Sequence, residues 1–207
     1  MKKVLEIGGF ISGAILIAFG VAVIALGASG RSTVNSNLKA EQITGSADVT
    51  PALIKAEATK AGLKNVSFPT CSVANKAVTS GTTARCFAQY MRIHALEASG
   101  GLPYSQMPRF ATADGKGTND ATMAMMANGQ PVANAARDTW VTETALSTAL
   151  NVSFMASQLS LFSIVVGLAL LLTGIGFVVL DYVALHVRRE KKATETAAVR
   201  TTTPALA

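Results

Sequence analysis

The chain has 207 residues, of which 50% are hydrophobic and only 14% are charged, and its mean hydropathy is +0.39. Soluble domains usually carry about 25% charged residues, so this composition excludes a disordered chain, a cysteine-dense scaffold and an ordinary cytosolic enzyme. The formal net charge of +6 is spread along the chain, which gives no indication of a nucleic-acid partner. We expect a small, mainly α-helical membrane protein.

Two uncharged apolar runs lie near the two ends of the chain. Residues 7–27 and 159–180 hold 21 and 22 positions without a charged side chain. At 1.5 Å per residue, each run covers about 31–33 Å, enough for a hydrocarbon core of about 30 Å. Lys2 and Lys3 precede the first run and a cationic cluster at 188–192 follows the second, so the positive-inside rule predicts two cytoplasmic termini.

The predicted organisation follows from these two spans. It comprises a cytoplasmic N-terminus (1–6), a transmembrane helix (7–27), an extracytoplasmic domain (28–158), a second transmembrane helix (159–180), and a cytoplasmic basic segment with a disordered tail (181–207) in the plasma (inner) membrane. A cleaved signal peptide ending at Ala25-Leu26-Gly27 is the alternative for the first run, although that run exceeds the usual 7–15 apolar residues. The 188–192 cluster is interpreted as a stop-transfer signal, with contact to anionic headgroups as the alternative.

Small residues recur every seven positions in both runs. Such spacing allows two helix backbones to approach closely in lipid. We therefore expect the two spans to pack antiparallel on each other in a helical hairpin, with oligomerisation through one stripe as the alternative. The predicted packing positions are Gly9, Gly13, Gly20 and Gly27 in the first span, and Ser160, Gly167 and Gly174 in the second.

Both cysteines, Cys71 and Cys86, fall in the predicted extracytoplasmic domain. An even number of cysteines in an oxidising compartment predicts one disulfide. The bridge would close a loop of about 15 residues and stabilise the fold by roughly 3 kcal/mol. Two free thiols or a metal pair are the alternatives, and no Cys-x-x-Cys spacing supports a metal.

Several short elements are predicted between the spans. Thr50-Pro51 is a good helix start and Gly62 a good stop, which predicts a helix over 51–61. A second helix is predicted over 83–98, with Phe87, Tyr90, Met91 and His94 toward the core.

Weaker patterns indicate a helix over 29–43, short strands at 65–68 and 77–79, and a short helix over 118–127 before an Asn128-Gly129 turn.

One long helix is predicted from about Asn134 to about His186, because no Pro or Gly interrupts its first 33 residues. We expect its outer part to be a stalk with one face covered by the small domain and with Trp140 as the anchor. An apolar seam with alternating steps of four and three residues runs along it and continues into the second span. Its outer members are Val141, Ala145, Thr148, Val152 and Met155.

Residues with catalytic or ligating chemistry are few. Arg92, His94 and Glu97 form one candidate polar cluster on the 83–98 helix, but the other histidine, His186, is predicted on the opposite side of the membrane. We therefore predict neither a metal nor a cofactor, and the chain has no Walker loop or Gly-x-Ser-x-Gly elbow. Met123, Met125 and Met126 indicate packing or a contact surface, with Cu(I) binding as the alternative.

Two stretches carry a resemblance to a known family: residues 87–97, Phe-Ala-Gln-Tyr-Met-Arg-Ile-His-Ala-Leu-Glu, and residues 140–155, which begin Trp-Val-Thr-Glu-Thr-Ala. With the flanking spans, they resemble a family of uncharacterised two-pass membrane proteins from actinobacteria. The resemblance implies a two-pass topology and no known activity. Some members bear an automatic label of aromatic ring-opening dioxygenase. We reject that label here. Enzymes of that kind resemble one another in needing iron held by at least two imidazoles and a carboxylate, and the predicted outer domain of this chain offers one imidazole.

These observations predict a non-enzymatic integral membrane protein of the cell envelope. Its outer domain would be an interaction or scaffold module for a membrane complex. The expected partners are the lipid bilayer around the spans, and either a protein of the envelope or further copies of the chain. One alternative is an oligomeric transport or channel accessory subunit. Another is an extracytoplasmic enzyme that uses Arg92, His94 and Glu97.

Overall fold

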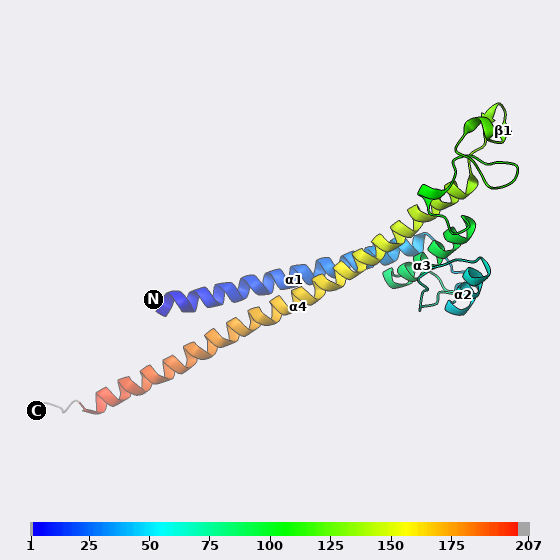
Figure 1. The fold of residues 1–207 in the computed structure, drawn as a ribbon. Helices are drawn as coiled ribbons and strands as arrows, with labels where there is room; N and C mark the ends of the chain where they lie inside the picture. The colour runs from blue at the N-terminus through cyan, green and yellow to red at the C-terminus, as the bar shows by residue number, and fades with distance from the viewer. Residues whose placement is uncertain (1, 203–207) are drawn as a thin grey trace, which may run out of the picture. The chain divides into compact units, whose positions relative to one another are not determined.

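The computed structural model is mainly helical, and it describes the backbone of residues 2–202 and the side chains of residues 7–191 and 194. Two short 3₁₀ turns, Tyr104–Gln106 and Ala121–Met123, accompany the longer elements. The α-helices among the described residues are α1 (Lys2–Ala40), α2 (Pro51–Lys60), α3 (Gly81–Ala98) and α4 (Ala135–Thr202), and the strands are β1 (Met126–Ala127) and β2 (Gln130–Pro131) (Figure 1).

The chain divides into two compact units. Residues 1–29 and 159–207 form one, here called the apolar unit, and residues 30–158 form the other, here called the disulfide unit. Both α1 and α4 contribute residues to each unit.

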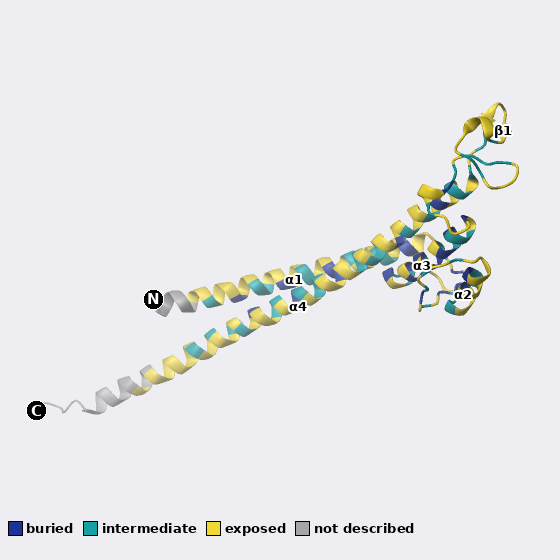
Figure 2. Ribbon diagram, viewed as in Figure 1, coloured by how far each residue is buried: buried dark blue, intermediate teal, exposed yellow. Residues whose placement is uncertain are grey.

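Two helical segments, Ile7–Ala40 and Ala135–Lys191, are long and apolar enough to cross a membrane. Only 11% of the most apolar stretch of each is buried, whereas the core helix of a soluble protein is mostly buried. Figure 2 shows exposed residues along most of both helices in the apolar unit. Large apolar side chains such as Phe19 and Leu26, 63% and 72% exposed, therefore face the surroundings of this unit.

Both long helices extend beyond their predicted limits. The helix predicted over 29–43 is the end of α1, which continues through Gly30 and ends at Ala40. A helical glycine costs about 1 kcal/mol, which the long flanking helix outweighs. The tail of the 181–207 segment, which is predicted to be disordered, is helical up to Thr202, where α4 ends, so that prediction is wrong for the described residues. Residues 194–202 contain neither Gly nor Pro, so no strong helix breaker interrupts this part of α4. Residues 203–207 lie outside the described part of the chain.

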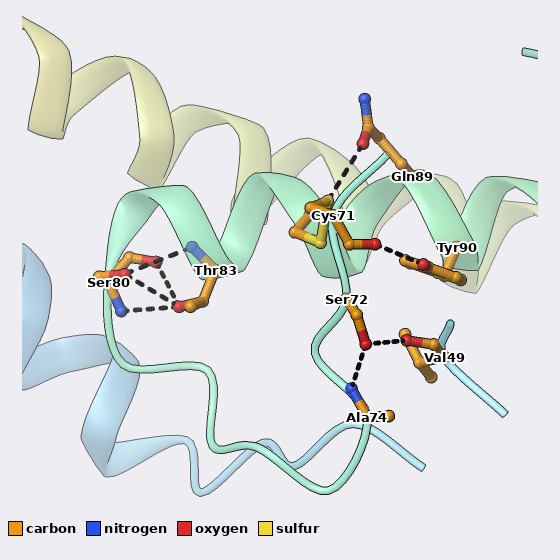
Figure 3. Close-up of a disulfide and its surroundings, with 9 residues drawn as sticks. Val49, Cys71, Ser72, Ala74, Ser80, Thr83, Gln89 and Tyr90 are labelled. Atoms are coloured by element: carbon orange, nitrogen blue, oxygen red, sulfur yellow. Dashed lines mark hydrogen bonds between the residues drawn. A yellow bond between two sulfur atoms is a disulfide. The ribbon is translucent and has the colours of Figure 1, made fainter. Parts of the chain in front are cut away.

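The helices of the disulfide unit begin where side chains can cap them. The Thr50 hydroxyl accepts a hydrogen bond from the Leu53 amide at 3.3 Å, and Pro51 occupies the first turn of α2. Gly62, with φ of +70°, follows the helix, as predicted. Helix α3 begins with a capping box in which Ser80 and Thr83 bond each other's backbone amides (Figure 3).

The core of the disulfide unit is built around α2 and α3. Tyr90, Ile54 and Ile93 are at most 1% exposed. Cys71 and Cys86 form the predicted disulfide, and the Tyr90 hydroxyl donates a hydrogen bond to the Cys71 carbonyl at 2.6 Å (Figure 3). The bridge and this hydrogen bond together fasten an irregular segment onto α3.

Three predictions for the irregular segments are wrong. Residues 65–68 form no strand in the described chain, and in the 77–79 segment Ala77 makes only an isolated bridge to Thr44. The short helix predicted over 118–127 is a 3₁₀ turn followed by β1, which pairs with β2 through Asn128-Gly129. Both turn residues have positive φ, which suits a tight hairpin.

Candidate functional site

Small residues bring α1 and α4 into backbone contact within the apolar unit. A Cβ atom added at Gly20 would lie 2.7 Å from the Gly167 carbonyl oxygen, and one added at Gly27 would lie 2.7 Å from the Ser160 carbonyl oxygen. Gly13 and Gly174 approach each other in the same way. Each predicted stripe of small residues therefore contacts the other stripe of the same chain. These positions are already filled by this contact between α1 and α4.

The end of this contact involves a carboxylate. The side chain of Asp181 lies directly over Gly9, and a Cβ atom at that position would collide with it. Among the described residues, the buried Oδ2 atom of Asp181 finds no hydrogen-bond partner. Gly9 thus provides space for a charged residue rather than for the opposite backbone.

The predicted seam of α4 does not face the rest of the disulfide unit. Val141, Val152 and Met155 are 54%, 57% and 69% exposed, and Ala145 and Thr148 are exposed as well. The face of α4 that the disulfide unit covers is therefore not the seam. The reason is that α4 carries a second set of residues with the same spacing on its opposite face.

That second face packs on α3. Trp140 is 6% exposed and contacts Ala95 and Met107, and Leu150 is 2% exposed in a second cluster. Gly81 permits close packing, because a Cβ atom there would meet Ser157. Trp140 thus anchors α4, as predicted, and the large residues on this face explain why it is buried in place of the seam.

The seam borders an apolar hollow of about 460 Å³. Its walls include Tyr104 and the buried Trp140, together with seam residues Val141, Ala145 and Thr148. The guanidinium of Arg92 lies 4.1 Å from the centre of the Trp140 ring, and that of Arg137 lies 4.1 Å from the Tyr104 ring. Both aromatic rings are therefore held in place by cation–π contacts.

His94 lies among carboxylates from other elements. Its Nδ1 atom is 3.2 Å from Glu97 Oε2, and its Nε2 atom is 3.9 Å from Asp48 Oδ2. Glu57 also approaches, so that one ligating atom each of Asp48, Glu57 and His94 lies within 4.8 Å of the others. We call these three residues the His94 cluster. Sequence reasoning missed Asp48 and Glu57, because only the tertiary fold brings the turn before α2, and α2 itself, to α3.

The predicted trio of Arg92, His94 and Glu97 does not converge on one site. His94 and Glu97 are in contact, but Arg92 turns to Trp140, and no ion pair joins it to the other two in the described part of the chain. A helix places residues two positions apart about 200° from each other, which explains the separation of Arg92 from His94.

Two carboxyl groups near His94 have shifted pKa values. A hydrogen bond from the Ser46 side chain lowers the pKa of Asp48, and His94 acts in the same direction. Burial raises the pKa of Glu143, and His94 partly opposes this shift. Within the described residues, Glu143 Oε2 is buried and has no hydrogen-bond partner.

The methionine-rich hairpin is a surface feature. Met123, Met125 and Met126 are 70%, 46% and 60% exposed, so they do not fill the core. Met107, by contrast, is 3% exposed and packs beside Trp140.

No family model, curated protein or solved structure matches the chain. The resemblance to actinobacterial two-pass membrane proteins therefore stays a prediction.

Proposed function

We propose that this protein is a two-pass integral membrane protein of the cell envelope whose extracytoplasmic unit is a self-association module. The apolar unit would cross the plasma membrane as an antiparallel hairpin, with both termini in the cytoplasm. The single observation that supports the module is the exposed seam of α4.

The composition of the apolar unit supports the membrane assignment. Its two helices contact each other through small residues and direct large apolar side chains outward. In water, such exposure would be costly, at about 25 cal/mol for each Å² of apolar surface. A lipid environment removes that cost, and small-residue contacts are the usual way in which helices pack there.

The seam favours a protein surface beyond the lipid. Between Asp138 and Asp181 the chain has one charged residue, Glu143, and that residue points away from the exposed face. The uncharged stretch of α4 from Thr144 to Leu180 covers about 56 Å, well beyond the 30 Å or so that a bilayer core needs. An exposed apolar strip outside the bilayer is a typical interaction surface.

A second copy of this chain is the occupant that the seam favours. The alternating steps of four and three residues are the pattern by which like helices pair as coiled coils. Two copies in one membrane would share the same orientation, so their seams would meet in parallel and in register. The flanking positions, among them Thr144 and Asn151, carry no charge, so two copies would not repel each other along the seam.

The topology is tested by labelling intact cells with an impermeant thiol reagent. Because the native cysteines are bridged, a cysteine replacing Lys116 is expected to react in intact cells. A cysteine replacing Thr194 is expected to react only after lysis. The reverse pattern would contradict the proposed orientation.

Self-association is tested by oxidative cross-linking in native membranes. Thr148→Cys places a thiol on the seam, and Thr142→Cys places the same thiol about 120° around the helix, also exposed. We expect a disulfide-linked dimer with Thr148→Cys and several-fold less with Thr142→Cys. Equal or absent cross-linking in the two variants would exclude the seam as the self-association surface.

A further inference from the structure

We infer that the His94 cluster is a binding site for a divalent transition-metal ion, with Zn²⁺ as the best-suited ion. Asp48, Glu57 and His94 would supply one imidazole nitrogen and two carboxylate oxygens. Glu97 would hold the imidazole in position. This site goes beyond the proposed self-association module and does not depend on it.

The distances suit a small metal ion. Zinc binds nitrogen and oxygen ligands at about 2.0–2.2 Å in tetrahedral geometry, so two ligand atoms on one ion lie roughly 3.4 Å apart. His94 Nε2 and Asp48 Oδ2, separated by 3.9 Å, lie close to this spacing. All three ligating atoms lie within 4.8 Å of one another. Side-chain rotations that move these atoms by roughly 1 Å would therefore complete the site.

The imidazole is oriented as metal-binding histidines usually are. In such sites one ring nitrogen binds the ion and the other donates its hydrogen to a carboxylate or carbonyl group. Here Nδ1 of His94 lies 3.2 Å from Glu97 Oε2, which leaves Nε2 toward Asp48. This arrangement favours the tautomer that presents an unprotonated Nε2 to the ion.

Each ligand is attached to a rigid part of the core. Asp48 precedes Val49, Glu57 precedes Ala58, and His94 follows Ile93, and these three apolar neighbours are at most 1% exposed. The three ligands come from separate places in the fold, namely the turn before α2, α2 itself and α3. The disulfide unit therefore holds the ligand positions before any ion arrives, which lowers the ordering cost of binding.

The site is open enough for an ion to enter and to keep water ligands. The side chains of His94 and Asp48 are 32% and 38% exposed. Asp48, Glu57 and Glu97 place three carboxylates beside the single imidazole of His94. This excess of negative charge attracts a cation. One imidazole with carboxylates is a ligand set that suits zinc, or manganese as a second choice, better than copper(I).

The test is calorimetric titration of ZnCl₂ into the full chain in detergent micelles. We expect one ion per chain, and a 10-fold or larger loss of affinity in each of His94→Ala, Asp48→Asn and Glu57→Gln. Glu97→Gln should weaken binding about 10–100-fold, as replacements of orienting carboxylates do. A cooperative unfolding transition measured in the absence of zinc shows that each variant is folded before binding is compared.

The matched control is His186→Ala. His186 is the only other histidine, and it also has one carboxylate neighbour, with Nδ1 3.6 Å from Glu190 Oε1. This variant should bind zinc as the unaltered chain does.

Binding that survives both Asp48→Asn and Glu57→Gln, or that is lost in His186→Ala, overturns the proposal. If His94→Ala does not fold, the two carboxylate variants decide the question. Zinc binding without Thr148→Cys cross-linking would contradict only the self-association module.

Discussion

The two units of this protein are held together by different kinds of contact. In the apolar unit, helix backbones approach within van der Waals distance because glycines replace side chains, and large apolar residues point outward. In the disulfide unit, large residues such as Tyr90 and Ile54 point inward, and a covalent bridge fastens an irregular segment. The same hydrophobic residue types therefore have opposite placements in the two units. In one unit they form the surface, and in the other they form the core.

This difference predicts that the two units respond to different substitutions, and the largest effect is expected at the disulfide. Replacing both Cys71 and Cys86 with serine should lower the free energy of unfolding of the disulfide unit by about 3 kcal/mol, because the bridge closes a 15-residue loop. Trp140, the only tryptophan, lies in this unit, so its fluorescence during denaturant titration reports the change. An unchanged midpoint would show that the bridge does not restrict the unfolded chain. The apolar unit should be unaffected.

A smaller effect is expected at one of the close backbone contacts of the apolar unit. Gly20→Val places new atoms against the Gly167 carbonyl oxygen and the Leu171 amide nitrogen, each 2.7 Å from the added Cβ. We expect it to destabilise the helix pair by about 1–3 kcal/mol, measured by SDS titration of the protein in mild detergent. Gly176→Val is the control, because no atom lies within 4 Å of its Cβ position. Equal losses in the two variants would indicate an effect of helix propensity rather than of the contact.

The smallest effect concerns a buried carboxylate and depends on pH. Because burial raises the pKa of Glu143 above its ordinary value of 4.5, the folded state favours the protonated form. Its stabilising contribution is present below about pH 4.5 and is lost as the pH rises through the folded-state pKa. Glu143→Gln should therefore stabilise the disulfide unit at pH 7, by about 1 kcal/mol or less, and the gain should vanish in acid.

The measurement is thermal unfolding of Glu143→Gln and the unaltered chain at pH 4 and pH 7. Glu41→Gln, at an exposed position, provides the control and should show no pH-dependent gain. A gain for Glu143→Gln that is larger at pH 4 than at pH 7 would contradict the assigned direction of the pKa shift.

Local patterns in the sequence determined the helical elements and the disulfide. Thr50, Pro51 and Gly62 delimit α2 through capping and backbone preference, which act within a few residues. The two long apolar helices were predicted from their uncharged runs, because each run excludes charged side chains over more than twenty consecutive residues. The irregular segment around residues 65–79 was not predicted correctly, because isolated bridges and side-chain hydrogen bonds leave no periodic pattern.

Tertiary structure alone decided which face of α4 is covered and what surrounds His94. Two faces of α4 carry residues at the same spacing, and periodicity does not distinguish Val152 on the exposed face from Leu150 on the buried one. Complementary packing against α3 selects between them. The carboxylates of Asp48 and Glu57 reach His94 only because the core brings α2 against α3. No residue spacing in the sequence therefore predicts this cluster.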